Sequence, residues 1–150
     1  MQIKKEDIDS VRSFNRFYTI VAGWLDLHLH HTPFSLPEAR VLYELKHHPS
    51  ATSSDLLQLL RMDKGYLSRI LSTLERRQLL VKVRSKADAR STLLKLTDKG
   101  RNEFSKLNQA SIDHVSSMLR HLTRSETSDL LHHMKQVRSI LEKTKMYEEA

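Results

Sequence analysis

The sequence predicts a mainly helical protein with one small β-hairpin. Apolar residues recur at steps of three and four through most of its 150 residues, which is the period of amphipathic helices. Only around residues 80–96 do short β-rich runs replace this period. A length of 150 residues fits one domain or two small packed subregions, and the lack of cysteine excludes disulfide scaffolds and thiolate metal sites.

The N-terminal part predicts two helices. Apolar residues at helical spacing indicate a long helix over about residues 6–31, and Pro33 marks a break soon after its end. Ser35 begins the second helix, because Glu38 three residues later completes a capping box. Residues 47–49, His-His-Pro, close this helix.

Two short helices follow. Thr52 caps the first, and Asp63 caps a second that runs to about Arg77. Because only three or four residues join them, they predict a helix-turn-helix. The residues expected on the buried side of the first of these helices are Leu56, Leu57, Leu59 and Leu60.

Two strands and two further helices complete the prediction. Residues 80–84 and 91–96 form the strands of a hairpin around a polar turn. Thr97 caps a long helix, and Thr123 with Glu126 forms a capping box for the last one. The charged segment 143–150 is expected to fray.

The positive charge of the chain is concentrated in its centre. Lys and Arg number 25 against 18 Asp and Glu, a formal net charge of +7. Twelve basic and four acidic residues lie between positions 61 and 101, and the remainder carries thirteen basic and fourteen acidic ones. Such segregation favours a polyanion-binding surface, although a solvated basic face is the alternative.

The helix after Asp63 has a face suited to DNA. With its leucines and Ile70 turned inward, the opposite face holds small residues and two arginines one heptad apart. Small side chains let a helix enter the major groove, where Arg can bond a guanine edge. Ordinary solvated faces favour Glu, Lys and Gln, and this one has no acid. The face comprises Gly65, Ser68, Arg69, Ser72, Thr73 and Arg76.

A basic hairpin after a helix-turn-helix makes a winged helix. Wings bring Arg or Lys to phosphates or to the narrow minor groove. Asp88 could orient Arg90, or form a loop ion pair without a role in DNA binding. The residues expected to contact DNA are Lys64, Gly65, Ser68, Arg69, Ser72, Thr73, Arg76, Arg84, Lys86, Asp88 and Arg90, with Lys82 beside them in the hairpin.

Several motifs resemble those of the MarR (multiple antibiotic resistance regulator) family. They are residues 63–69 (DKGYLSR), 74–77 (LERR), 88–91 (DARS) and 96–100 (LTDKG). The stretches 11–18 and 34–45 resemble a subgroup often fused to a GNAT acetyltransferase domain, for which three isolated glycines offer no acetyl-CoA loop. One departure is Gln78, where the family usually has glycine. A non-glycine residue in a left-handed position costs roughly 1 kcal/mol.

The resemblance spans about residues 8–142 and implies a homodimer. It implies that residues 1–34 and 101–150 form a helical dimerisation region, and that residues 35–100 form the DNA-binding winged helix. Family ligand pockets lie between these regions, so Trp24, His28 and Tyr43 are candidates for contact with a small-molecule effector, or are core residues.

Other kinds of site find little support. The scattered glycines exclude G-x-G and P-loop cradles, and no catalytic triad or carboxylate pair can be argued, so we expect neither an enzyme nor a cofactor. His28, His30 and His31 do not share one helical face, so no metal ligand is assigned, although a zinc site between elements stays open. No transmembrane segment or signal peptide is visible, and a cytoplasmic location is expected.

The sequence thus favours a dimeric regulator that binds palindromic duplex DNA, with an effector shifting the spacing of its recognition helices. A regulatory or interaction module of an acetyltransferase-linked protein is one alternative. A zinc-responsive regulator and a sequence-tolerant architectural DNA binder are the others.

Overall fold

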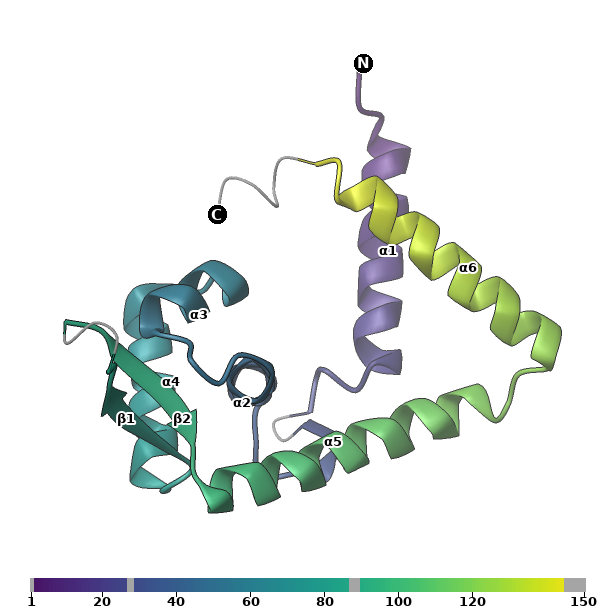
Figure 1. The fold of residues 1–150 in the computed structure, drawn as a ribbon. Helices are drawn as coiled ribbons and strands as arrows, with labels where there is room; N and C mark the ends of the chain where they lie inside the picture. The colour runs from purple at the N-terminus through teal and green to yellow at the C-terminus, as the bar shows by residue number, and fades with distance from the viewer. Residues whose placement is uncertain (1, 27–28, 87–89, 145–150) are drawn as a thin grey trace.

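The structure, a computed structural model, describes residues 2–26, 29–86 and 90–144. The described residues form α1 (Lys5–Val21), a 3₁₀ turn (Leu29–His31), α2 (Leu36–His47), α3 (Ser53–Leu60), α4 (Lys64–Arg76), β1 (Leu80–Arg84), β2 (Thr92–Leu96), α5 (Asp98–Leu119) and α6 (Arg124–Leu141). Helices α2 to α4 and the hairpin gather at one end, from which α5 leads away and α6 turns back toward α1 (Figure 1). A mainly helical fold with one hairpin is therefore confirmed.

The first helix is shorter than predicted. It ends at Val21 rather than near residue 31, and Gly23 follows in the left-handed region with φ +66°. The Leu29 amide donates to the Phe34 carbonyl at 2.7 Å, which folds this segment into a turn. Leu29 is buried by that turn, whereas Trp24 is 47% exposed. Helical spacing of apolar residues therefore continued beyond the helix itself, and the prediction over residues 22–26 and 29–31 was wrong.

The predicted helix starts are confirmed by their hydrogen bonds. Ser35, Thr52 and Thr123 each form a capping box with an acidic residue three positions later. Asp63 accepts from the Tyr66 amide, and Thr97 accepts from the Gly100 amide. These bonds satisfy amides that the first turn of a helix leaves without partners.

The hairpin is attached to the helical layer through the α2–α3 turn. Its antiparallel register pairs Leu80 with Leu96 and Arg84 with Thr92, and the Leu94 amide donates to the Ala51 carbonyl at 2.8 Å. At the other end, a Cβ on Gly100 would overlap the Leu79 carbonyl oxygen. The start of α5 therefore packs directly on the backbone that precedes β1.

One core fills the end of the molecule that contains α2 to α4 and the hairpin. Val41, Leu42, Leu56, Leu74 and Leu94 have no measurable exposure. One prediction for α3 was wrong: Leu59 is 45% exposed, while Leu57 and Leu60 are half-buried against the core. An eight-residue helix covered on one side cannot bury four leucines.

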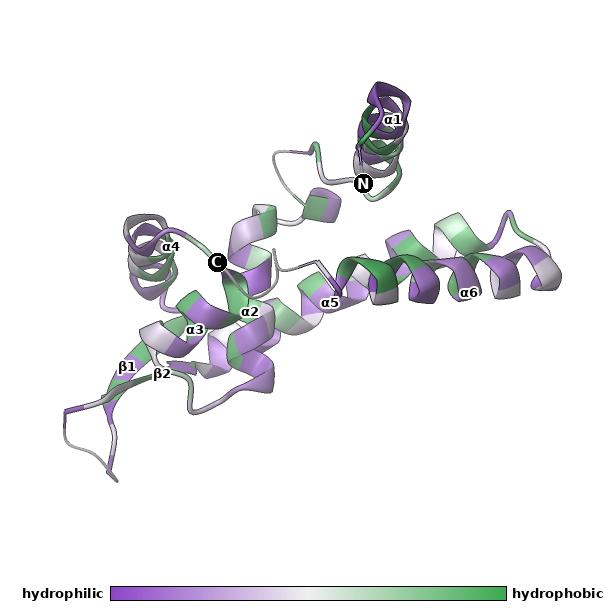
Figure 2. Cartoon of the chain, turned by 90° about the horizontal axis from the view of Figure 1, so that it is seen from above, coloured by the Kyte–Doolittle hydropathy of each residue, from purple (hydrophilic) through white to green (hydrophobic). Residues whose placement is uncertain are grey.

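Helices α1 and α6 have a different environment. Every residue of both helices is exposed or half-buried. Apolar residues recur along α6 beside polar ones, as the alternating green and purple in Figure 2 shows. Phe14 and Phe17 of α1 are 54% and 62% exposed. Among the described residues, no helix is long and apolar enough to span a bilayer.

Candidate nucleic-acid interface

Helix α4 has one buried face and one exposed face. Leu67, Ile70, Leu71 and Leu74 are buried against the core. A helix turns by about 100° per residue, so the positions between these leucines point outward. The core thus fixes the rotation of α4 about its axis and with it the side chains that face solvent.

The exposed face of α4 carries no acidic side chain in the structure as described. Of the predicted contact residues on this helix, Thr73 is half-buried and the other six are exposed. Arg76 donates to the Thr73 hydroxyl at 3.3 Å, along its own helix. The exposed residues are Lys64, Gly65, Ser68, Arg69, Ser72 and Arg76.

Tyr66 lies beside this face and was absent from the predicted contacts. Its side chain is 41% exposed, and the Arg69 guanidinium carbon lies 5.9 Å from the centre of its ring. A guanidinium at this distance is attracted by the negative face of the ring. Tyr66 therefore restrains Arg69 and adds an aromatic surface to the interface. The i to i+3 spacing of Tyr66 and Arg69 was the available signal.

An ion pair ties α4 to the hairpin. The Lys82 ammonium on β1 lies 2.7 Å from a carboxylate oxygen of Glu75 on α4. Both side chains are about two-fifths exposed, so the pair contributes little to stability. Its effect is to neutralise the one acid of α4 that lies beside the interface. A cavity of about 200 Å³ near this pair is lined by Ser53, Lys64, Ser68, Ser72, Lys82 and three leucines.

The hairpin presents further basic side chains. Arg84, Lys86 and Arg90 are all exposed, and the hairpin lies at the same end of the molecule as α4 (Figure 1). Asp88 lies outside the described residues, so its predicted role beside Arg90 stays a prediction. The exposed face of α4 and the hairpin thus form one basic surface that matches the shape of a winged helix.

The two predicted effector residues that the structure describes, Trp24 and Tyr43, pack against different neighbours. Trp24 packs edge-on against Tyr18 with ring centres 5.6 Å apart, whereas Tyr43 stacks on His47 at 4.1 Å. His28 lies outside the described residues. Neither Trp24 nor Tyr43 lines the cavity that lies between α1 and α5, and contact of these residues with an effector stays a prediction.

A cavity of about 510 Å³ is formed by the end of α1, the 3₁₀ turn and α5. The rings of His30 and His114 lie there with centres 4.4 Å apart, and a His114 ring nitrogen is 3.0 Å from the Val21 carbonyl oxygen. Burial, followed by repulsion from His114, lowers the pKa of His30. Sequence reasoning missed this pair because 84 positions separate its members.

No group of three or more His, Asp or Glu side chains in residues 2–26, 29–86 and 90–144 is arranged to hold a metal ion. His47 and His48 bond the carbonyls of Tyr43 and Glu44 within their own helix turn. His132 and His133 diverge, with rings crossed at 67°.

Residues 32–91 match the sequence model of the MarR family. Over this segment the chain is therefore similar to the MarR family. The matched segment contains α2 to α4 and the hairpin up to the start of β2, which is the basic surface with its supporting core. A search of curated proteins by sequence found no match.

Several solved structures share the fold over nearly the whole chain. A mutant of E. coli MarR complexed with operator DNA has 22% identity and a TM-score of 0.71, covering 91% of this chain and 99% of the other. The repressor CouR bound to a 23-mer DNA duplex has 22% identity and a TM-score of 0.72, covering 92% and 99%. Bordetella bronchiseptica BpsR, whose DNA binding is regulated by 6-hydroxynicotinic acid, has 17% identity and a TM-score of 0.67, covering 87% and 98%.

Proposed function

We propose that this protein is a transcriptional regulator of the MarR family that binds palindromic duplex DNA with α4 and the hairpin. The observation that carries the proposal is the exposed face of α4, where small side chains and two arginines stand without an acid. Arg69 would read a base edge from mid-helix, Lys64 and Arg76 would contact phosphates, and Arg90 would enter the minor groove. The DNA-bound relatives support this assignment through their common fold.

We also propose that the protein acts as a homodimer through its terminal helices. A groove of about 550 Å³ between α1 and α6 is lined by Phe14, Phe17, Leu130, Met134 and Val137 among others. Apolar surface of this kind on a monomer favours association. Residues 1–34 and 101–150 would then form the dimerisation region, and residues 35–100 the DNA-binding region. A regulator of this kind would act in the cytoplasm.

Footprinting on the DNA that flanks the gene tests the proposal. We expect protection of a palindrome whose half-sites lie about one helical turn apart. Several phosphate contacts per protomer predict that affinity falls by roughly 10³-fold or more between 50 and 200 mM salt. A nearly flat salt dependence would mean that the basic surface is only solvated. Equal affinity for operator and random DNA would favour an architectural binder instead.

The cavity beside His30 and His114 supports effector control. It lies between α1 and α5, so a ligand there would contact both the proposed dimerisation helices and the turn before α2. A ligand changes DNA affinity only if it binds the two states of the dimer differently. The compound that regulates DNA binding by BpsR, 6-hydroxynicotinic acid, is an aromatic carboxylate and is our first probe for this cavity, which three histidines and two aspartates line. We expect it to weaken operator binding by the wild type and less so by His114→Ala.

An acetyltransferase-linked role makes a different prediction. The family-model match and the DNA-bound structure of E. coli MarR support a regulator rather than an enzyme. If the chain instead acts as an interaction module of an acetyltransferase, it should co-purify with such a subunit and bind operator and random duplex with the same weak affinity. Sequence-specific footprinting together with an isolated homodimer would contradict that role.

A further inference from the structure

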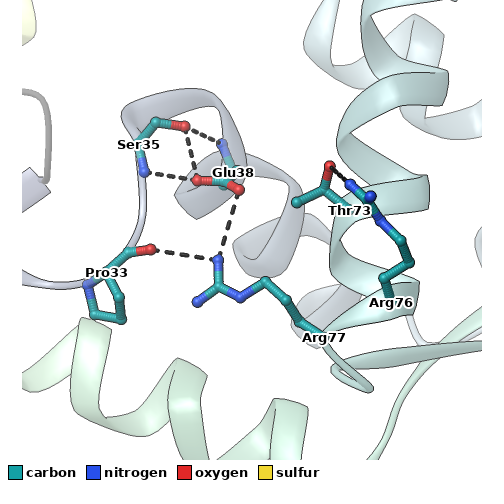
Figure 3. A network of polar contacts seen from close by, with 6 residues as sticks. All are labelled: Pro33, Ser35, Glu38, Thr73, Arg76 and Arg77. Atoms are coloured by element: carbon teal, nitrogen blue, oxygen red, sulfur yellow. Dashed lines mark hydrogen bonds and ion pairs between the residues drawn. The ribbon is translucent and has the colours of Figure 1, made fainter.

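Arg76 and Arg77 are adjacent basic residues with different surroundings. Arg76 is exposed and bonds within its own helix, whereas Arg77 is half-buried and points toward the start of α2 (Figure 3). Successive residues of a helix diverge by about 100°, which separates the two guanidinium groups. Arg77 therefore belongs to the basic segment by sequence but not to the exposed face of α4.

The Arg77 side chain has three partners on the segment that leads into α2. Its Nη1 donates to the Pro33 carbonyl oxygen at 3.3 Å and lies 3.6 Å from Oε1 of Glu38. Its guanidinium carbon lies 4.4 Å from the centre of the buried Phe34 ring. A carbonyl, a carboxylate and an aromatic face are all good partners for a planar guanidinium. Arg77 is therefore placed to hold protein groups together and not to contact a phosphate.

Glu38 connects this contact to the start of α2. Its Oε2 accepts from the Ser35 amide at 2.8 Å and from the Ser35 hydroxyl at 3.0 Å, while its Oε1 faces Arg77 (Figure 3). The two oxygens of one carboxylate thus cap α2 and hold the end of α4. Any movement of α4 relative to α2 would have to break this arrangement.

The backbone at the same end of α4 is held by α5. The Arg77 carbonyl accepts from the Lys99 ammonium at 2.8 Å, and the Gln78 carbonyl accepts from the Thr97 hydroxyl at 2.7 Å. Helices α2 and α5 both lead from the DNA-binding region toward the proposed dimerisation helices. The end of α4 therefore contacts both α2 and α5, and a movement of either helix would change the orientation of α4.

We propose that Arg77 is a positioning residue for DNA binding: it fixes the direction of α4 against the segment 33–38 and thereby selects the half-site spacing that the dimer recognises. This inference rests on the proposed function, because spacing has meaning only for a dimer with two recognition helices. Removing the contact lets α4 sample several directions, so the competent orientation is populated for only a fraction of the time. Apparent affinity for the best operator falls by that fraction.

The test measures binding to operators whose half-site spacing varies in steps of one base pair. Wild type, Arg77→Gln and Arg76→Gln are compared by fluorescence anisotropy at two salt concentrations, with a random duplex as reference. Arg76→Gln is the matched control, because it removes the neighbouring charge without touching segment 33–38. We expect Arg77→Gln to bind the best-spaced operator roughly tenfold more weakly, and to bind neighbouring spacings nearly as well as the best one.

The salt slope and the random duplex separate the two arginines. For Arg77→Gln we expect the salt slope and the affinity for random duplex to equal those of the wild type, because no phosphate contact is lost. For Arg76→Gln we expect a slope lower by about 1 per site with an unchanged spacing preference. If Arg77→Gln instead lowers the slope and the affinity for random DNA, Arg77 is a phosphate contact and the inference is wrong.

A second variant guards against a folding defect. Glu38→Gln retains a capping amide but loses the charge that faces Arg77, so it should broaden the spacing preference in the same direction. Combined with Arg77→Gln it should add no further broadening, because both changes remove one contact. An unaltered spacing preference in both single variants, with wild-type binding intact, overturns this inference alone. Absence of sequence-specific binding by the wild type overturns the proposed function as well.

Discussion

The two ends of the molecule differ in how their apolar residues are covered. In the region of α2 to α4 and the hairpin, Leu42, Leu56 and Leu74 are completely enclosed by the same chain. In α1 and α6, apolar side chains such as Phe17 and Ile140 are about three-fifths exposed. The first region is covered by its own chain, whereas the proposed dimer would cover the second. The proposal thus places the core and the assembly surface in separate parts of one chain.

The largest expected effect concerns the uncovered surface. Val137 is 48% exposed and lines the groove between α1 and α6, so Val137→Asp should place a charge in the dimer interface and yield monomers. Loss of bivalency should weaken operator binding by about 10²–10⁴-fold. Light scattering at micromolar protein measures the mass. Ser139→Asp, on the opposite side of α6, is the control and should leave a dimer. A monomeric wild type would contradict the proposed dimer.

A second experiment contrasts the enclosed core with the exposed stripe. Leu74→Ala leaves a cavity in the core and should lower the free energy of unfolding by about 2–5 kcal/mol at any protein concentration. The effect of Ile140→Ala, at an exposed position of α6, should instead depend on concentration, because a dimer is stabilised by mass action. Denaturant unfolding over a hundredfold range of concentration distinguishes them. Equal, concentration-independent losses would show that both regions fold as one unit.

Within the winged-helix region, two arginines should lose different kinds of binding. Arg69→Ala should cost about 1–3 kcal/mol on operator DNA and relax the preference at one base pair per half-site. Arg90→Ala should weaken binding to all sequences, with any remaining preference following A·T content in the flanks. Titrations on operator, single-base-substituted operator and random duplex measure both. Equal weakening on operator and random DNA by Arg69→Ala would reject its base-reading role.

The smallest expected effect lies where the two regions meet. Burial, followed by repulsion from His114, holds the pKa of His30 below its ordinary 6.5, against an opposing attraction from Asp26. The folded state therefore favours the neutral form of His30. The contribution of this residue to the free energy of unfolding is complete above pH 6.5 and declines as the pH falls through the pKa of the folded state. Thermal unfolding between pH 8 and 5 should show a shallower acid decline for His30→Gln. An identical decline in both proteins would show that His30 is not responsible.

The sequence predicted most of the enclosed region and less of the uncovered one. Capping residues such as Thr52 and Thr97 mark helix starts by local hydrogen bonds, and the strand over residues 80–84 was confirmed at both ends. Local signals suffice there because each bond joins residues close in sequence. The end of α1 was missed because a left-handed Gly23 stops a helix without interrupting its apolar spacing.

The candidate site divides in the same way. The exposed face of α4 follows from helical geometry once Leu67 and Leu74 are placed inward, so Arg69 and Arg76 could be predicted as exposed. The partners of Arg77 could not, because Pro33 lies 44 positions away and the charge pattern assigns Arg77 to the same group as its neighbour. Long-range contacts leave no periodic signal in a single sequence.

The shared carboxylate of Glu38 has a consequence for how the gene can change. Its two oxygens serve Ser35 on one side and Arg77 on the other, so a substitution at position 38 would disturb two helices at once. Drift at any one of these three positions should be tolerated only when the others change with it. Substitutions at positions 35, 38 and 77 should therefore occur together. Second-site suppressors of a Glu38 variant should arise preferentially at positions 35 and 77.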